Sequence, residues 1–384
     1  MDISKLLGGY RPGHSLEQAF YTDGDVFARD MDLLLGRWIC VGHASELPNA
    51  GDYLVAELGA ESAIVARNPD GEIRAMANVC RHRGSRVCVK PHGHAMILTC
   101  PYHAWTYHLD GRLRQAREMP EGFDPAAHGL FPLPLTIVGG LIFISFAPSP
   151  PAIDAGAAAL ETMTAHYGWD TAKVAARKTF TVNSNWKLAL ENYHECYHCA
   201  PAHPEFSVLH ALARPGNRRI GGEDVEAWGP APDGREVYRV MHSGLTDGSR
   251  TGSRDGKPLA PLMGHAAYDG ECVFGELGFL SAFLAYPDHG LIYRFIPRDV
   301  LRTEMEVIWL VRGDAEAGRD YDPEALTRLW DVTSVADKTI IERNQAGVLS
   351  RFYRPGPFSR MEPGTRQYVE RYVGEMARLV SAAA

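Results

Sequence analysis

Two short segments that each pair a cysteine with a histidine constrain this chain more than any other feature. The first is Cys80-Arg-His82 and the second is Cys100-Pro-Tyr-His103. Two thiolates and two imidazoles at this spacing can hold a two-iron, two-sulfide cluster, with the cysteines on one iron and the histidines on the other. Such a cluster relays electrons. A second redox centre is therefore expected elsewhere in the chain.

A structural zinc site is the alternative for the same four residues. Zinc fingers pair two closely spaced cysteines with two closely spaced histidines, whereas each half here contributes one cysteine and one histidine. The alternation favours a cluster held between the tips of two loops. Gly84, which follows the first pair, would let the backbone approach the sulfides closely.

The bulk properties of the chain exclude several classes of function. Its 384 residues are enough for two domains with separate cores. A formal charge of −8 and the lack of any Lys/Arg run argue against nucleic-acid binding. No apolar run approaches membrane-spanning length, and the first residues lack a signal-peptide core. Seven cysteines do not suit a disulfide framework, so we expect a cytoplasmic protein.

The order of the predicted elements indicates an α+β protein built from a small all-β domain and a larger mixed domain. Residues 15–35 are predicted to be helical, with Ser15 as N-cap. From Trp38 to about residue 148, short strand-like segments alternate with turns rich in Gly, Pro, Asn and Asp, and both cysteine–histidine segments lie among them. A proline-rich boundary begins at Ala147.

Beyond this boundary the chain is predicted to mix helices with strands. Helices are expected over 153–166 and 184–200, from about 324 to 349, and from about 364 to the end, with strands between 271 and 312. The region 213–262 is rich in Gly, Arg, Pro and Asp and is predicted to form long loops, which often act as lids or assembly contacts.

A second metal centre is predicted around His198 and His203. Pro201 and Pro204 are expected to end the helix between the histidines, so that His203 can bend back beside His198 and leave room for a third ligand. Two histidines and one carboxylate with open coordination positions are typical of a non-haem iron(II) oxygenase.

Two rival ligand sets remain open in this segment. His194 and His198 are four residues apart and would share one face of a helix. Cys196 and Cys199 could join the histidines in a zinc site, although a thiolate-rich site would leave no open position for O₂.

The carboxylate ligand is expected from another element, because Glu191 and Glu195 lie on the helix that supplies the imidazoles. Asp331, Asp337 and Glu342 lie on the long C-terminal helix, and their spacing alone does not separate them.

The two motifs together resemble the catalytic (alpha) subunit of Rieske-type non-haem iron oxygenases. The second motif, Asn-Trp-Lys…Glu-Asn-Tyr…Glu-x-x-His-x4-His, runs from residue 185 to 203, and the resemblance covers essentially the whole chain. It implies two cofactors, a [2Fe-2S] cluster and a mononuclear iron(II). The implied ligands are Cys80, His82, Cys100 and His103 for the cluster, and His198, His203 and Asp337 for the iron.

The resemblance also implies the domain layout. Residues 1–37 would form a helical segment that packs on the catalytic domain, and residues 38–148 would form the Rieske domain. Residues 149–384 would form the catalytic domain, with a curved antiparallel sheet covered by helices in a helix-grip, START-like arrangement. One departure from the family pattern is Ala104, where glycine is usual; its methyl group would be tolerated at negative φ.

Members of this family assemble as head-to-tail homotrimers, in which the cluster of one subunit faces the iron of the next. The resemblance gives Glu195 the role of bridging carboxylate. It would accept one hydrogen bond from His198 and another from His103 of the neighbouring subunit.

The local sequences around Arg11, Asn78 and Glu195 resemble those of the branch of this family that acts on quaternary ammonium compounds such as glycine betaine. The implied reaction is hydroxylation of an N-methyl group, followed by demethylation and release of formaldehyde. Oxygenation or O-demethylation of an aromatic compound is the alternative, and a simple electron carrier is a third reading. No nucleotide-binding fingerprint is visible, so a separate NAD(P)H-dependent reductase is expected.

A permanently cationic substrate is expected to require an aromatic box. The candidates lie in the strand-rich region of the second domain: Phe274, Phe279, Phe283, Tyr286, Tyr293, Phe295 and Trp309.

Overall fold

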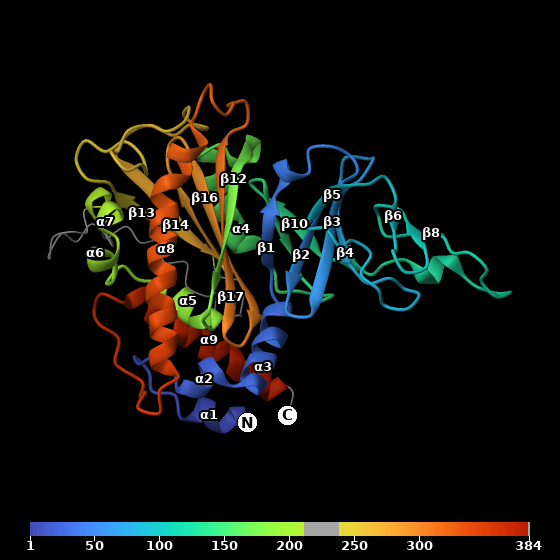
Figure 1. Cartoon of the computed structure of the whole chain (residues 1–384), viewed down its shortest axis with the longest axis horizontal. Helices are drawn as coiled ribbons and strands as arrows, with labels where there is room; N and C mark the ends of the chain where they lie inside the picture. Colours follow the sequence, from blue (N-terminus) through green and yellow to red (C-terminus); the bar gives the residue numbers. More distant parts are fainter. Residues whose placement is uncertain (211–237, 383–384) are drawn as a thin grey trace.

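The structure, a computed structural model, describes residues 1–210 and 238–382 of the chain. Figure 1 shows a small lobe of short strands beside a larger lobe, in which helices surround a long sheet. The predicted α+β class, with a small all-β domain and a larger mixed domain, is confirmed.

The small lobe contains a five-stranded antiparallel sheet in the order β5-β2-β3-β4-β9 and a three-stranded sheet in the order β6-β7-β8. Its elements are β2 (Asp52–Leu58), β3 (Glu61–Arg67), β4 (Ile73–Ala77), β5 (His92–His94), β6 (Leu98–Thr99), β7 (Thr106–Tyr107), β8 (Leu113–Gln115), the 3-10 helix η2 (Pro125–His128) and β9 (Pro132–Leu133). The turn between β3 and β4 contains Gly71 at φ +89°, a backbone conformation that glycine adopts without strain. The two cysteine–histidine segments lie in the loops before β5 and between β6 and β7.

A second three-stranded sheet, in the order β1-β11-β10, joins the two lobes. It consists of β1 (Ile39–His43), β10 (Leu135–Val138) and β11 (Leu141–Ile144), and the 3-10 helix η1 (Ala44–Glu46) follows β1. Phe143 of β11 belongs to the same buried cluster as Trp169 and Phe283 of the larger lobe. The small lobe is therefore attached through a continuous apolar core.

The larger lobe is built on a six-stranded antiparallel sheet in the order β12-β17-β16-β15-β14-β13. The strands are β12 (Ala172–Val182), β13 (Tyr238–Gly244), β14 (Glu271–Leu277), β15 (Ser281–Ala285), β16 (Gly290–Asp299) and β17 (Arg302–Arg312). Alternate residues of β16 enter different cores: Tyr293 packs on one face of the sheet and Ile292 on the other. Burial of both faces explains the nearly continuous apolar sequence of this strand.

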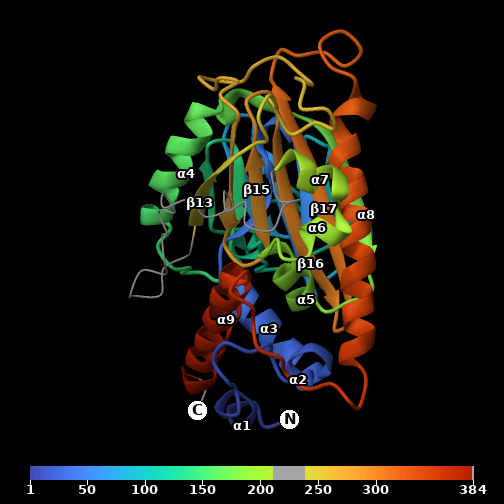
Figure 2. The same ribbon diagram turned by 90° about the vertical axis from the view of Figure 1, so that its left-hand side faces the viewer.

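Helices cover both faces of this sheet, with α8 along one side and α4 on the other (Figure 2). The helices are α1 (Ile3–Gly8), α2 (Gln18–Thr22), α3 (Gly24–Leu35), α4 (Asp154–His166), the 3-10 helix η3 (Trp169–Thr171), α5 (Trp186–Tyr193), α6 (Cys199–Ala202), α7 (Pro204–Leu209), α8 (Pro323–Val348) and α9 (Pro363–Ala382). The predicted helices over 153–166, 324–349 and from 364 onward agree with α4, α8 and α9. Within the part of the chain that the structure describes, no helix is long and apolar enough to cross a membrane.

The N-terminal helix prediction is wrong in detail. Residues 15–35 form two helices, α2 and α3, whose N-caps are Glu17 and Asp23. The Ser15 hydroxyl instead lies 3.2 Å from the hydroxyl of Tyr353 and accepts a hydrogen bond from the backbone N–H of Gly356. Ser15 therefore ties the N-terminal segment to the loop before α9.

The helix predicted over 184–200 is also interrupted. It ends at Tyr193, because the Glu195 side chain accepts hydrogen bonds from the backbone N–H groups of Tyr197 and His198 and so stabilises a turn. Of the loops predicted over 213–262, residues 211–237 lie outside the described residues. Residues 238–244 form β13 instead of the predicted loop, and residues 245–262 are irregular as predicted.

Candidate metal centres

Three predicted ligands meet at one point beside the sheet of the larger lobe. The Nε2 atoms of His203 and His198 lie 2.8 Å and 3.3 Å from Oδ1 of Asp337. One ligand atom from each of the three residues lies within 4.8 Å of the ligand atoms of the other two. His203 is buried and its Nδ1 has no partner, while Asp337 is about one-sixth exposed. Two imidazoles and one carboxylate at these distances fit a single metal ion with open coordination positions.

A one-turn helix produces this arrangement. His198 immediately precedes α6, and His203 lies between α6 and α7, where its backbone N–H donates to the carbonyl of Cys199 at 2.8 Å. Pro204 occupies the first turn of α7, as predicted for a residue that separates two helices. Pro201 lies inside α6 rather than at its end. Its missing N–H is harmless there, because the first N–H groups of a helix have no intrahelical partner.

Glu195 fixes the orientation of His198. Its Oε1 accepts a hydrogen bond from His198 Nδ1 at 2.5 Å, which leaves Nε2 free to face Asp337. Burial alone would lower the pKa of the His198 imidazole, but its hydrogen bonds to Asp337 and Glu195 outweigh burial and raise the pKa to about 10. Burial alone would raise the pKa of the Asp337 carboxyl group. Its hydrogen bonds to the two imidazoles outweigh burial and hold this pKa below its usual value. A negative ligand therefore faces two oriented imidazoles.

The rival ligands at this centre lie elsewhere or have other partners. His194 stacks on Tyr368 and lies 3.3 Å from Glu276, because the interruption of the helix separates it from His198. Asp331 pairs with Lys178 on the surface. Glu342 accepts hydrogen bonds from Asn183. Neither Cys196 nor Cys199 belongs to the group of ligand atoms that converge on one point among the described residues.

The four predicted cluster ligands meet at the tip of the small lobe. Cys80 and Cys100 are buried and belong to one apolar cluster. The Nδ1 atoms of His82 and His103 lie 3.1 Å apart at the exposed edge. In the described part of the chain these four residues do not form a group with all ligand atoms within 4.8 Å. The two sulfurs form one pair and the two ring nitrogens form another, and the two pairs are too far apart to bind a single ion. This arrangement fits a two-iron cluster and disfavours the zinc alternative.

Neighbouring rings support this tip. His82 stacks on the buried Trp105 with 4.9 Å between ring centroids, and His103 stacks on the exposed Tyr102. The hydroxyl of Tyr107 lies 3.2 Å from Cys80 Sγ. Hydrogen bonds to the sulfurs are among the features that set the potential of such a cluster.

The condition under which Ala104 was expected to be tolerated is not met, because its φ is +56°. The backbone N–H of Ala104 donates to the carbonyl of Cys100 at 3.0 Å, which closes the ligand loop with a left-handed residue. An alanine methyl group is strained in this conformation, and glycine would avoid the strain.

The aromatic candidates separate into those near the metal centre and those far from it. Tyr286 and Tyr293 both approach Trp330, with centroids 6.4 Å and 5.9 Å away, and Trp330 contacts Phe206, three residues after His203. Phe295 adjoins the same group through Tyr193. The remaining candidates have other surroundings: Phe274 is half-buried, Phe279 packs on Tyr368, Phe283 packs on Trp169, and Trp309 is core.

Phe206 and Trp330 were not predicted, because the aromatic candidates all came from the strand-rich region of the second domain. Trp330 precedes Asp337 by seven residues on α8, two turns along the same face. This spacing is the feature of the sequence that could have identified Trp330 as a neighbour of the metal centre.

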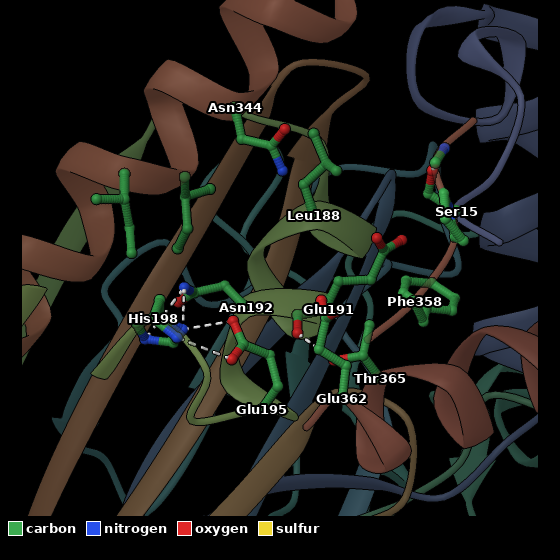
Figure 3. Close-up of a pocket in the computed structure, with 14 residues that line it drawn as sticks. Ser15, Leu188, Glu191, Asn192, Glu195, His198, Asn344, Phe358, Glu362 and Thr365 are labelled. Atoms are coloured by element: carbon green, nitrogen blue, oxygen red, sulfur yellow. Dashed lines mark hydrogen bonds and ion pairs between the residues drawn. The ribbon is translucent and has the colours of Figure 1, made fainter. Parts of the chain in front are cut away.

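A cavity of about 370 Å³ opens beside His198 (Figure 3). Asn192, Glu195 and His198 line one side of it, and Phe358 and Glu362 of the loop before α9 line another. The amide nitrogen of Asn192 lies 3.4 Å from His198 Nε2. The cavity therefore reaches His198, one of the three candidate metal ligands, from the side of Glu195.

Two family models match separate parts of the chain. Residues 37–134 match the Rieske [2Fe-2S] domain, and residues 169–378 match the ring hydroxylating alpha subunit (catalytic domain). The chain is 38% identical to the glycine betaine monooxygenase oxygenase subunit of Chromohalobacter salexigens, over 97% of this chain and 88% of that one. It is 40% identical to the carnitine monooxygenase oxygenase subunit of Escherichia coli over 49% of this chain and 52% of that one.

Among solved structures, a quaternary ammonium Rieske monooxygenase superposes with a TM-score of 0.76 at 24% identity, over 98% of both chains. This likeness shows the fold alone. The domain matches, which cover more than half of the chain, show its family. The chain belongs to the Rieske non-haem iron oxygenases, whose alpha subunits hold a [2Fe-2S] cluster and a mononuclear iron.

Proposed function

We propose that this chain is the oxygenase component of a two-component monooxygenase that demethylates a quaternary ammonium compound, glycine betaine or a similar betaine. The observation that carries the proposal is the match to a glycine betaine monooxygenase oxygenase subunit along 97% of the chain. The aromatic group beside the metal ligands supports it, because a cation without N–H groups is held best by ring faces.

The proposed ligands follow from the two centres described above. Cys80 and Cys100 would bind one cluster iron, and His82 and His103 the other. The mononuclear iron would be held by the triad of ligand atoms that converge within 4.8 Å: His198, His203 and Asp337.

When bound, the two metal centres supply electrons and activate O₂ for oxidation of an N-methyl carbon. The overall change balances as R–N(CH₃)₃⁺ + O₂ + 2 e⁻ + 2 H⁺ → R–NH(CH₃)₂⁺ + CH₂O + H₂O. The protein's own residues position the methyl group and keep the two imidazoles in place. Glu195 does the latter through His198 Nδ1.

The substrate box would be formed by the aromatic group that contacts His203. Phe206 lies 6.4 Å from His203 between ring centroids and 5.6 Å from Trp330. Tyr286 and Tyr293 complete the group on the side of the sheet. We expect Trp330→Leu to raise KM for a betaine strongly while iron content stays normal, because the ring face and not the metal ligand is lost.

A head-to-tail homotrimer would bring the cluster of one subunit to the iron of the next. The exposed cluster tip carries the cation Arg83, whereas the cavity beside His198 presents Glu195 and Glu362. Opposite charges on these two surfaces favour their contact. The related quaternary ammonium monooxygenase with a TM-score of 0.76 is described with inter-subunit electron transfer.

Glu195→Gln tests the bridging role. We expect the assembled variant to lose most of its turnover, while Glu205→Gln, which alters an exposed glutamate of α7, behaves as wild type. Cluster reduction by the reductase should stay normal in both. Unchanged turnover of an assembled Glu195→Gln trimer would rule out the bridge.

A separate NAD(P)H-dependent reductase and a cytoplasmic location complete the proposal. All seven cysteines are free thiols in the structure, which suits a reducing compartment. Purified chain should not turn over with NADH alone. Turnover without a reductase would refute the two-component proposal.

Formaldehyde release tests the substrate class directly. Holoenzyme with a suitable reductase is offered glycine betaine, proline betaine, carnitine, choline and vanillate, and iron is measured in the same samples. We expect formaldehyde from a betaine, none from vanillate, and about three irons per chain. Formaldehyde from vanillate alone would support the aromatic alternative, and two irons per chain would support an electron carrier.

A further inference from the structure

Two cysteines flank the metal ligand His198 and are not used by either metal centre. Cys196 and Cys199 are the only pair in the chain with Cys-x-x-Cys spacing. The backbone N–H of Cys199 donates to the carbonyl of Cys196 at 3.3 Å, so the two residues close one turn around His198. The Cys199 thiol lies 3.9 Å from His198 Nε2.

The geometry of this turn suits a disulfide bond. A turn closed by a bond between residues three apart keeps its end Cα atoms within about 7 Å. Disulfides form at Cα separations of about 4.4–6.8 Å. The backbone separation therefore permits the bond, once the side chains and the turn adjust to the short sulfur–sulfur distance.

The two thiols differ in access to solvent. Cys196 is partly exposed, whereas Cys199 is 3% exposed and its carbonyl accepts a hydrogen bond from the Ser207 hydroxyl at 2.6 Å. A small oxidant therefore meets Cys196 first, and Cys199 is placed behind it as a resolving thiol. An accessible cysteine beside a resolving cysteine is the usual arrangement of redox-sensitive dithiols.

We propose that Cys196 and Cys199 form a peroxide-sensitive dithiol whose oxidation to a disulfide loosens the iron-binding turn. Hydrogen peroxide oxidises the first thiol: Cys196–SH + H₂O₂ → Cys196–SOH + H₂O. The second thiol then condenses with it: Cys199–SH + Cys196–SOH → Cys196–S–S–Cys199 + H₂O. A dithiol reductant reverses the change.

Iron is affected because His198 lies inside the loop that the disulfide closes. The backbone N–H of His198 and its Nδ1 are both held by Glu195, and this places Nε2 toward Asp337. Drawing the two sulfurs to bonding distance, about 2.05 Å, changes the backbone of the turn that contains the ligand. Disturbing the groups that orient a metal ligand weakens metal binding by about 10–100-fold.

Thiol mapping of the holoenzyme tests the proposal without any substrate. Wild-type holoenzyme is treated with hydrogen peroxide, unreacted thiols are alkylated, and the tryptic peptide spanning residues 188–218 is weighed. We expect this peptide to lose two hydrogens and both alkylation sites, and to regain them after treatment with dithiothreitol. The buried Cys40 and Cys272 serve as internal controls and should be alkylated only after denaturation.

Iron release gives the second readout. Peroxide is first removed and the iron is returned to iron(II) with ascorbate, so that the samples differ only in the disulfide. Transfer of the mononuclear iron to a ferrous chelator should then be about tenfold faster with the disulfide present and should return to the original rate after treatment with dithiothreitol. Cys196→Ser should remove both the disulfide and the acceleration. A peptide that only gains oxygen, or a disulfide that leaves iron release unchanged, would overturn the proposal. Neither readout depends on turnover, so both stand apart from the substrate assay.

Discussion

A buried ion pair links the N-terminal helices to α5, the helix that precedes the turn carrying His198. Lys187 of α5 pairs with Asp30 of α3, and both side chains are fully buried. The hydroxyl of Tyr372 in α9 donates to Asp30 Oδ1 at 2.6 Å, and Trp186 Nε1 donates to Oδ2 at 3.1 Å. Burial raises the pKa of Asp30 and lowers that of Lys187, so each group depends on the other to stay charged. Lys187→Met is therefore expected to destabilise the protein strongly.

The magnitude follows from what the substitution leaves behind. Methionine fills most of the lysine volume, so the main penalty is a buried carboxylate without its cation, about 3–5 kcal/mol. The matched control is Lys178→Met, because Lys178 pairs with Asp331 at the surface with 43% of its side chain exposed. A surface pair contributes about 0–1 kcal/mol. The two variants remove the same charge and differ mainly in burial.

Denaturant unfolding of the holoenzyme, followed by tryptophan fluorescence, measures the difference. Asp30→Asn combined with Lys187→Met should recover part of the loss, because no charge then remains buried while the amide oxygen of the introduced asparagine can still accept from Tyr372. Equal destabilisation by Lys187→Met and Lys178→Met would refute the reasoning. A double variant whose loss of stability equals the sum of the two single losses would also refute the reasoning.

Three further predictions concern single side chains. Burial raises the pKa of Glu191 to about 8, whereas the unfolded side chain titrates near 4.5. Between these pH values the folded state holds a proton that the unfolded state releases, so the free energy of unfolding falls as pH rises. Glu191→Gln should therefore become increasingly stabilising, relative to wild type, over that range in denaturant unfolding. Ala104→Gly should stabilise the cluster-bearing lobe by about 1 kcal/mol in thermal unfolding, and a lower Tm would contradict the strain at φ +56°. Asp337→Ala should lower iron from about three to about two per chain while the cluster's absorption persists, and retention of the third iron would exclude Asp337 as a ligand.

The sequence predicted the metal chemistry better than the backbone that carries it. Cysteine and histidine spacing restricts which residues can share a metal, so both centres were predicted as groups before any fold was known. The carboxylate ligand could not be predicted from spacing in the same way. Asp331, Asp337 and Glu342 have equivalent positions on one long helix, and only tertiary contacts separate them: Asp331 meets Lys178, whereas Asp337 meets His203.

The two wrong helix predictions, over 15–35 and 184–200, share a cause, which is competition by side-chain hydrogen bonds. The periodicity from 184 to 200 predicts one helix, but Glu195 takes the N–H groups that would continue it. Ser15 has the chemistry of an N-cap, yet its hydroxyl is used by Tyr353 and Gly356. Such competition depends on the particular partners that each side chain meets, so hydrophobic periodicity does not reveal it.

The position of the iron-binding turn depends on α5 more than on the turn itself. Residues 186–191 are all buried, and the pair of Lys187 with Asp30 fixes the start of the helix. At its other end, the Thr365 hydroxyl donates to the carbonyl of Glu191 at 2.8 Å. A Cβ atom on Gly364 would lie 2.2 Å from the carbonyl oxygen of His194, so α9 packs at a distance that only glycine permits. Since α5 is fixed by α3 at one end and by α9 at the other, the short turn after it can place His198 without a long helix of its own.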